Sequence, residues 1–332
     1  MNALDNKTNV SNQIAISNLL SETGQEEIIS EIITGLTSDQ KYISSKYFYD
    51  HTGSKLFEDI TQLPDYYLTR TEKSILQKVA PQITKGLNNI DLIELGSGDC
   101  SKISIIIDSI PVKYHDSIRY VPVDVSHSAI RKSADNLSIQ FTDIKVHGVI
   151  ADFMSHLDLI PGQSNRLICF FGSTLGNLTR EQSMQFLLDL KKNMQPGDQL
   201  LLGLDMVKNK TILERAYNDD QQITAAFNKN ILNNVNRMLH TDFDPNCFDH
   251  LAFYNEEKSR IEMHLTASKN MEVTSPNLPA KISFKRGETI HTENSHKYTN
   301  EHIFNFSLLS GLKIKNIYSD TNRWFSVVHF LY

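Results

Sequence analysis

Three acidic residues follow three apolar runs of the chain, and each could bind part of a small ligand. Glu94 stands just before the glycine turn 96–98, Asp124 ends the next run, and Asp152 follows the third run beside Phe153. Glycines let a backbone approach a ligand closely. A carboxylate such as Asp124 can accept both hydroxyls of a ribose, and an acid beside an aromatic ring suits an adenine. A glycine turn alone is structural about as often as not, and an Asp at a strand end is more often a turn or cap residue than a ligand, but the three sites in this order indicate a nucleotide-like cofactor.

The glycine turn distinguishes between two classes of cofactor. The dinucleotide pattern G-x-G-x-x-G requires a third glycine where this chain has Ser101. The pattern acid-x-Gly-x-Gly instead resembles motif one of the S-adenosylmethionine-dependent methyltransferases, and this resemblance implies S-adenosylmethionine as the cofactor. The cofactor-binding residues that we predict are Glu94, Gly96, Ser97, Gly98, Lys102, Asp124, Asp152, Phe153, Gly172 and Ser173.

The elements that must position these residues alternate between strand and helix. Five short runs are apolar on both faces, as are the inner strands of a parallel sheet covered by helices. They span residues 91–95, 120–125, 145–150, 166–171 and 199–204. Helix-length segments separate them, such as residues 180–193. The pattern predicts an α/β fold, which we describe as a seven-stranded Rossmann-like class I methyltransferase sheet with a second, smaller α+β substrate domain.

The alternation of strand and helix lapses after Met206. Residues 208–265 are predicted to be mostly helical, because apolar residues recur at every fourth position from Phe227 to Leu239. The later predicted elements are short strands and turns over 262–290, a helix at 300–310, and strands at 313–318 and 324–332. An insertion before the last two strands would explain this order. The predicted domains are a substrate-binding domain of residues 1–62 and 207–297, and a cofactor-binding domain of residues 63–206 and 298–332.

Several longer motifs resemble the histidine-specific Nα-methyltransferases of ergothioneine biosynthesis. The resemblance runs from about Tyr47 to the C-terminus. Its motifs are the spaced N-terminal signature from Tyr47 to Glu72, Phe171-Gly-Ser-Thr-Leu-Gly-Asn177, Arg215-Ala-Tyr217, Thr224-Ala-Ala-Phe227-Asn228 and Ile261-Glu-Met263. In that family a cofactor domain is paired with a substrate domain built from the N-terminal segment and a late insertion. The family's reaction is the trimethylation of the α-amino group of free L-histidine to hercynine, the first step of ergothioneine biosynthesis.

The resemblance also implies roles for single residues. Asn177 and Tyr217 match the residues that bind the substrate carboxylate, and Glu293 and Ser295 match the pair that binds the imidazole. The predicted substrate-binding residues are Tyr66, Asn177, Tyr217, Thr224, Phe227, Met263, Glu293 and Ser295. Tyr49 and Tyr66 are the predicted catalytic residues, which could accept a hydrogen bond from the amine or make cation–π contacts with the methylated product. Lys102 matches a lysine that we expect to pair with the cofactor carboxylate.

Other interpretations stay open. Asn177 could cap a helix near Thr179, Tyr217 could be a packing residue, and Glu293 could be a solvated strand charge. The substrate could be another small amine or an aromatic amino acid such as tryptophan. A protein or RNA methyltransferase, or a catalytically inactive binding module, would be further alternatives.

Composition limits these alternatives. The chain has 332 residues and a net charge of −6, and no run of Lys or Arg exceeds two, so it lacks the basic signature of a nucleic-acid-binding protein. Its three cysteines are odd in number and far apart, which favours a reducing compartment, and its histidines show no metal-ligand spacing. No apolar run approaches the 20 or so residues of a membrane span, and no secretory signal is evident. We therefore expect a cytoplasmic monomer that binds a small molecule and no metal, nucleic acid or membrane.

Overall fold

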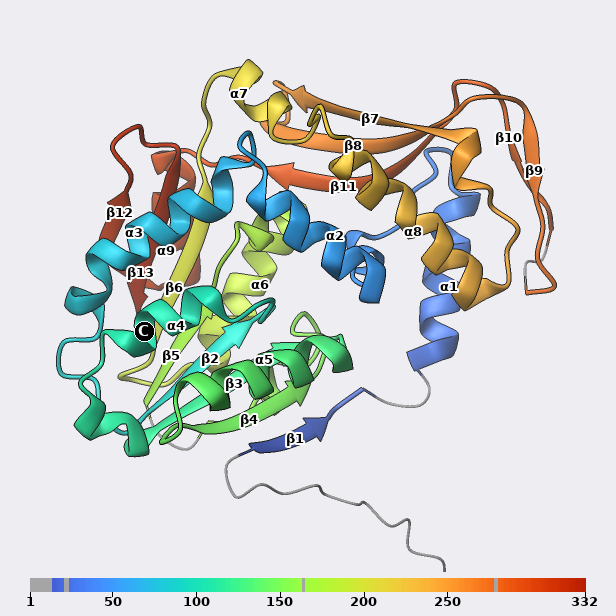
Figure 1. The fold of residues 1–332 in the computed structure, drawn as a ribbon. Helices are drawn as coiled ribbons and strands as arrows, with labels where there is room; N and C mark the ends of the chain where they lie inside the picture. Colours follow the sequence, from blue (N-terminus) through green and yellow to red (C-terminus); the bar gives the residue numbers. More distant parts are fainter. Residues whose placement is uncertain (1–13, 21–23, 163–164, 278–279) are drawn as a thin grey trace, which may run out of the picture.

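An eight-stranded sheet forms the base of the molecule, in the order β1-β4-β3-β2-β5-β6-β13-β12 (Figure 1). The structure is a computed structural model that describes residues 14–20, 24–162, 165–277 and 280–332. The strands from β1 to β6 run parallel, whereas β13 is antiparallel to both of its neighbours. The strands are β1 (Ile14–Asn18), β2 (Ile90–Leu95), β3 (Ile118–Asp124), β4 (Lys145–Ile150), β5 (Asn165–Phe170), β6 (Gln199–Asp205), β12 (Lys313–Ser319) and β13 (Phe325–Leu331). The predicted α/β class is confirmed.

The predicted count of seven strands in this sheet is wrong. The additional strand is β1, which pairs in parallel with β4 from Ile14 opposite Val146 to Asn18 opposite Ile150. The predicted boundaries assign these residues to the substrate domain, but they lie at the edge of the large sheet. An edge strand is covered less completely than an inner one, so its apolar signal is short and weak. Residues 1–13 of the predicted N-terminal segment lie outside the described residues.

Helices cover both faces of the large sheet, as the apolar runs predict. One face packs against α3 (Tyr67–Ile83), α4 (Ser101–Asp108) and α5 (His127–Gln140). The other face packs against α6 (Arg180–Asn193) and α9 (Asn300–Ser310). Because side chains alternate across a strand, Leu92 and Ile93 belong to different clusters of the core.

A smaller α+β part lies above the ends of these strands in Figure 1. It contains a three-stranded antiparallel sheet, in the order β11-β8-β7, against which α8 packs. Its elements are α1 (Gly24–Thr37), α2 (His51–Gln62), α7 (Lys210–Arg215), α8 (Ile223–Leu239), β7 (Phe248–Asn255), β8 (Arg260–Ala267), β9 (Met271–Val273), β10 (Ile282–Phe284) and β11 (Thr289–His296). Short 3-10 helices occur at η1 (Ser45–Phe48), η2 (Val112–Ser117), η3 (Leu157–Leu159), η4 (Thr174–Asn177) and η5 (Pro245–Cys247).

The predicted helical character of residues 208–265 is correct only as far as Leu239. Residues 248–255 and 260–267 are strands β7 and β8. In β8 the apolar residues Ile261, Met263 and Leu265 alternate with polar ones, which is the period of a strand. The helical prediction is wrong for these residues because the strong helical period of α8, directly before them, ends at Leu239.

The two parts share one apolar cluster. Phe227 and Met263 of the smaller part belong to the same cluster as Leu76 of α3 and Leu92 of β2. The N-terminal helices and the insertion are therefore held against the large sheet by continuous packing.

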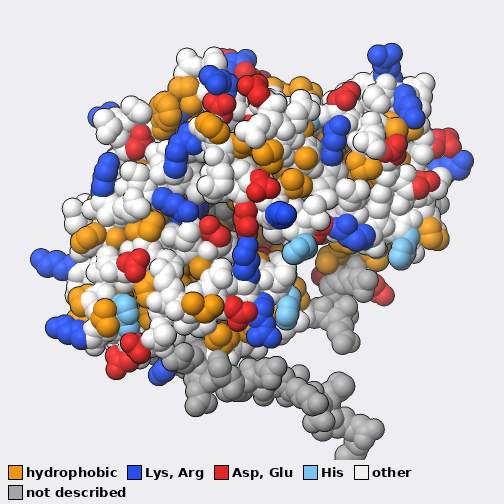
Figure 2. Space-filling view, viewed as in Figure 1, with side chains coloured by type: hydrophobic (Ala, Val, Ile, Leu, Met, Phe, Trp, Pro, Cys, Tyr) orange, Lys and Arg blue, Asp and Glu red, His pale blue; other side chains and the backbone are white. Residues whose placement is uncertain are grey.

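Acidic and basic side chains are interspersed over the face that Figure 2 shows. Within the described ranges, no helix is both long enough and apolar enough to cross a membrane.

Candidate functional site

The glycine turn after β2 leaves space for a ligand. Gly96 and Gly98 have positive φ values of 73° and 48°, and a Cβ atom built at either would meet no atom within 4 Å. Between them, the Ser97 hydroxyl is buried and has no hydrogen-bond partner in the described structure. A buried hydroxyl without a partner is costly. The turn therefore fits a bound group that approaches the backbone and satisfies Ser97.

Glu94, at the base of this turn, is a buried carboxyl group held by one hydroxyl. The Tyr120 hydroxyl donates a hydrogen bond of 2.6 Å to Glu94 Oε2. Burial raises the pKa of Glu94 to about 8, although Tyr120 and the charge of Lys102 favour the ionised form. A bound cation beside Glu94 would lower this pKa again.

Asp124 and Asp152 both bind the turns that follow their strands. The Ser126 amide donates to Asp124 Oδ1 at 2.9 Å, and the Met154 amide donates to Asp152 Oδ1 at the same distance. Burial raises the pKa of Asp124 to about 6, against the effect of its backbone hydrogen bonds. Phe153 packs edge-on against Phe170, with ring centroids 5.3 Å apart. The turn role of both acids is thus real, and a ligand role would be additional to it.

Glu72 of α3 is a buried acid that the sequence analysis did not select. Both of its carboxylate oxygens accept the Gly172 amide, at 3.0 and 2.9 Å, and Lys102 Nζ lies 2.7 Å from Oε2. Lys102 and Gly172 were both predicted to bind the cofactor, and Glu72 connects them. The only signal for it was its place in the N-terminal signature. The predicted pairing of Lys102 with a cofactor carboxylate stays a prediction.

Ser173 has a structural role in this structure. Its hydroxyl accepts the Asp205 amide at 2.9 Å, and its own backbone is left-handed, with φ of 58°. Ser173 as a whole is only 1% exposed. Contact between Ser173 and a cofactor stays a prediction.

Five aromatic rings from two stretches of the chain, residues 49–66 and 217–227, pack against one another. Phe57 is the central member, with its ring centroid 5.7 Å from Tyr49, 6.2 Å from Tyr66 and 5.9 Å from Phe227. Tyr66 also lies 6.2 Å from Tyr217. Aromatic faces attract cations, so this aromatic cluster (Tyr49, Phe57, Tyr66, Tyr217 and Phe227) can surround a methylated ammonium group.

Glu293 and Ser295 lie on one face of β11, as their spacing predicts. Glu293 is opposite Met263 of β8, and Ser295 is opposite Ile261. The pairing of β11 with β8 shifts register between His291 and Glu293, which places Glu293 on the same face as Met263. Burial raises the pKa of Glu293 to about 7, although Lys297 favours its ionised form. Glu293 is therefore not a solvated strand charge.

The raised pKa of Glu293 predicts a pH-dependent stability difference. In the unfolded chain Glu293 ionises at its ordinary pKa of 4.5, so the folded state loses stability as the pH rises from that value to about 7, and the loss is complete above it. We expect Glu293→Gln to raise the thermal unfolding midpoint by a few degrees at pH 8.5 and much less at pH 5.5. Thermal scans of both proteins at the two pH values measure this. An equal change in the unfolding midpoint at both pH values would contradict a raised pKa for Glu293.

Asn177 and Thr224 present polar atoms that the described residues leave unused. Asn177 ends the 3-10 helix η4, and no hydrogen bond joins its side chain to another described residue. The cap of α6 is instead Thr179, whose hydroxyl accepts the Gln182 amide at 3.2 Å. Thr224 Oγ1 is buried and has no partner among the described residues. The helix-cap interpretation of Asn177 is therefore wrong, and both groups can serve a ligand.

Tyr49 interacts electrostatically with one carboxylate of the predicted cofactor site and one of the predicted substrate site. Burial raises the pKa of Tyr49 far above its ordinary value, and the charges of Glu293 and Asp124 raise it further. Burial likewise raises the pKa of Tyr66, and electrostatic interactions with Tyr217, Tyr49 and Glu293 raise it further. Tyr49 is therefore within electrostatic range of both Asp124, the predicted ribose-binding carboxylate, and Glu293, the predicted imidazole-binding carboxylate. Both tyrosines are neutral at physiological pH.

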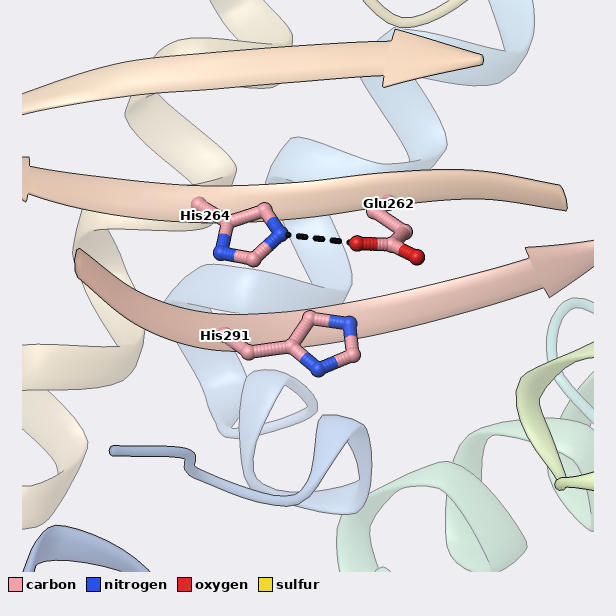
Figure 3. A group of neighbouring side chains, drawn as sticks. All are labelled: Glu262, His264 and His291. Carbon is pink, nitrogen blue, oxygen red and sulfur yellow. Dashed lines mark hydrogen bonds and ion pairs between the residues drawn. The ribbon is translucent and has the colours of Figure 1, made fainter. Parts of the chain in front are cut away.

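A cluster of Glu262, His264 and His291 lies on the other face of the small sheet (Figure 3). Its possible metal-ligating atoms are within 4.8 Å of one another, a proximity that sequence spacing could not reveal. Hydrogen bonds already use Glu262 and one nitrogen of each histidine, while His264 Nδ1 is buried with no partner among the described residues. Glu262 Oε1 accepts from Arg260, Glu262 Oε2 bonds to His264 at 3.2 Å, and His291 Nε2 donates to the Glu293 carbonyl at 3.0 Å. The rings of His264 and His291 stack with their centroids 4.7 Å apart, which stabilises the register shift in β11 that orients Glu293.

Comparison with known proteins assigns a family to this arrangement. The model of the histidine-specific, S-adenosylmethionine-dependent methyltransferases matches residues 28–331. The chain belongs to this family. It is therefore an S-adenosylmethionine-dependent methyltransferase, as the glycine turn and the three acidic residues predicted.

Individual relatives agree with this family. A histidine N-alpha-methyltransferase of Mycolicibacterium smegmatis is 38% identical over 303 residues, covering 91% of this chain and 94% of the relative. Ergothioneine biosynthesis protein 1 of Schizosaccharomyces pombe is 30% identical over 271 residues, covering 78% of this chain and 35% of that protein. A 4-dimethylallyltryptophan N-methyltransferase of Penicillium roqueforti is 26% identical over 298 residues, covering 85% and 87%.

Proposed function

We propose that this methyltransferase trimethylates the α-amino group of free L-histidine to hercynine, the first step of ergothioneine biosynthesis. The observation that carries the proposal is the Glu293–Ser295 pair on one face of β11, adjoining the aromatic cluster. A carboxylate and a hydroxyl can serve the two nitrogens of an imidazole. The 38% identity to a protein named histidine N-alpha-methyltransferase supports the same substrate.

The residues around the glycine turn would hold the cofactor. We assign Asp124 to the ribose hydroxyls, Asp152 and Phe153 to the adenine, and Glu94 with Ser97 to the methionine end. The bound cofactor supplies a methyl group on a sulfonium. Glu72 positions Lys102 and the Gly172 amide at the same end of the sheet. The open space above Gly96 and Gly98 is consistent with this placement.

The substrate residues would orient the amine without a strong base. Tyr49 and Tyr66 have pKa values far above neutrality, so they act as neutral hydroxyls that position the amine. The attacking amine must be neutral, because an ammonium has no lone pair, and we propose that its proton leaves to water. Asn177 would bind the carboxylate, whereas in this structure the Tyr217 hydroxyl donates its one hydrogen to Ser295 Oγ at 2.8 Å and so adjoins the ring-binding residues. Anchoring the substrate by its carboxylate and its ring leaves the nitrogen free for three successive transfers.

The alternative substrate is an aromatic amino acid such as tryptophan. The relative named for 4-dimethylallyltryptophan keeps this possibility open at 26% identity. An indole offers one N–H donor and no acceptor, so it would leave the hydrogen of the Ser295 hydroxyl without an acceptor. The Glu293–Ser295 pair therefore favours histidine.

A direct assay tests the proposed function. The purified protein is incubated with S-adenosylmethionine and either histidine or tryptophan, and products are identified by mass spectrometry. We expect mono-, di- and trimethylated histidine in sequence, and little or no methylated tryptophan. Preferential methylation of tryptophan, or no turnover of either amino acid, would refute the proposal.

We further propose that the protein acts as a monomer in the cytoplasm, with two domains. The free, separate cysteines support the reducing compartment. The proposed cofactor domain is residues 63–206 and 298–332, together with β1, and the proposed substrate domain is the rest of residues 1–62 and 207–297. Size-exclusion chromatography with light scattering measures the oligomeric state.

A further inference from the structure

Lys297 is an ammonium group buried at the junction of the two sheets. It follows β11 directly and is 0% exposed. Its Nζ lies 2.8 Å from Asp205 Oδ2, at the end of β6. Burial opposes ionisation of Asp205, but the charges of Lys297 and Lys208 outweigh it and lower the pKa of Asp205. The Lys297–Asp205 pair is therefore charged, and neither the predicted site residues nor the proposed mechanism uses it.

The three hydrogens of the Lys297 ammonium have three acceptors. Besides Asp205, they are Ser295 Oγ at 2.8 Å and the Tyr217 hydroxyl oxygen at 3.2 Å. An ammonium can only donate. Both hydroxyl oxygens must therefore accept from Lys297, which leaves each with its own hydrogen to donate.

The two hydroxyls also bond to each other, and this determines where the last hydrogen points. Tyr217 donates to Ser295 Oγ at 2.8 Å. A serine oxygen has two lone pairs, and both are now filled, one by Lys297 and one by Tyr217. No described residue accepts a hydrogen bond from Ser295. Its hydrogen is thus available only to a ligand on the face of β11 that Ser295 shares with Glu293.

We propose that Lys297 is a positioning residue that makes Ser295 a hydrogen-bond donor and so determines which ring the site accepts. The inference rests on the proposed histidine function. With Ser295 as donor and the Glu293 carboxylate as acceptor, the matching ring carries one lone-pair nitrogen and one N–H. A neutral imidazole has both. An imidazolium has two donors, and a pyrrole or indole has one donor and no acceptor, so each leaves the Ser295 hydrogen unpaired.

Ring analogues measure this selection. In pyrrol-2-ylalanine and pyrrol-3-ylalanine, one or the other imidazole nitrogen is replaced by C–H while the N–H is kept. Calorimetry on the protein with bound S-adenosylhomocysteine compares them with histidine. We expect the analogue that lacks the nitrogen facing Ser295 to bind roughly 10- to 100-fold more weakly than histidine.

The decisive variant is Lys297→Met, which keeps an unbranched side chain of similar length. We expect the ratio of histidine to analogue affinity to fall to within a few-fold, with S-adenosylhomocysteine affinity unchanged. Ser295→Ala should reduce the ratio equally, and the double variant should reduce it no further. Lys145→Met, at an exposed position on β4, is the matched control and should keep the wild-type ratio.

Other outcomes overturn the inference. If Lys297→Met weakens all three amino acids equally and leaves the ratio intact, Lys297 is only structural. If Lys297→Met does not fold, Ser295→Ala still decides, because it leaves the Lys297–Asp205 pair in place. An unchanged ratio in Ser295→Ala would show that Ser295 is not the donor. If wild-type protein methylates another amino acid and does not bind histidine, the proposed function itself fails.

Discussion

Replacing Glu293 with glutamine is expected to weaken histidine binding by roughly 10- to 100-fold and to leave S-adenosylhomocysteine binding within about twofold. A hydrogen bond to a charged group contributes about 1.5–3 kcal/mol, and glutamine keeps the size of the side chain but removes the charge. Glu293 is also separated along the chain from every predicted cofactor residue. Isothermal titration with each ligand at pH 8 measures both affinities.

The control for Glu293→Gln is Glu257→Gln, an exposed acid in the turn between β7 and β8. This variant should bind both ligands as the wild type does. If Glu293→Gln weakened cofactor and histidine equally, Glu293 would support the whole fold of the site instead of binding the ring. Because stability above pH 7 is expected to increase in this variant, loss of folding would not explain weaker binding.

Replacing Asp124 with asparagine is expected to weaken the binding of the cofactor rather than that of histidine. We expect S-adenosylhomocysteine affinity to fall roughly 10- to 100-fold, because a neutral amide presents one acceptor oxygen where the carboxylate presents two. The asparagine oxygen can still accept the Ser126 amide, so the turn after β3 should persist. Calorimetric titration with S-adenosylhomocysteine measures the change.

Asp143→Asn is the matched control for Asp124→Asn. Asp143 is exposed in the turn before β4, and its replacement should leave cofactor affinity unchanged. Circular dichroism should show the same helix content in both variants. An unchanged cofactor affinity in Asp124→Asn would mean that the Asp124 carboxylate only accepts the Ser126 amide in its turn and does not bind the cofactor.

Local patterns were sufficient to predict the large sheet and the sequence positions of most candidate residues. The strands β2 to β6, together with α6 and α9, were predicted nearly residue by residue, and for the strands the reason is that burial on both faces gives a continuous apolar run. Glu94, Asp124 and Asp152 follow directly from this, since the carboxyl ends of parallel strands meet at one edge. The spacing of Glu293 and Ser295 likewise placed both on one face.

Long-range contacts were not predictable in this way. Glu72 is 100 residues from the Gly172 amide that it binds, and Tyr217 is 78 residues from Ser295. The edge strand β1, the strands β7 and β8, and the irregularity in β11 were missed for related reasons. The apolar signal of β1 is weak, that of β11 is interrupted, and the strands β7 and β8 follow directly on the strong helical period of α8. Pairing with a distant strand stabilises them.

The sequence by itself determined the class of sheet, the acids at its edge and the family that the chain belongs to, because these depend on residue types at fixed local spacing. Only the tertiary structure decided what each polar group bonds to. It showed that Asn177 is not the helix cap, and that hydrogen bonds join Lys297, Tyr217 and Ser295 to one another. The physical reason is that a buried donor or acceptor must find its partner in space, and packing brings together residues whose separation along the chain carries no signal.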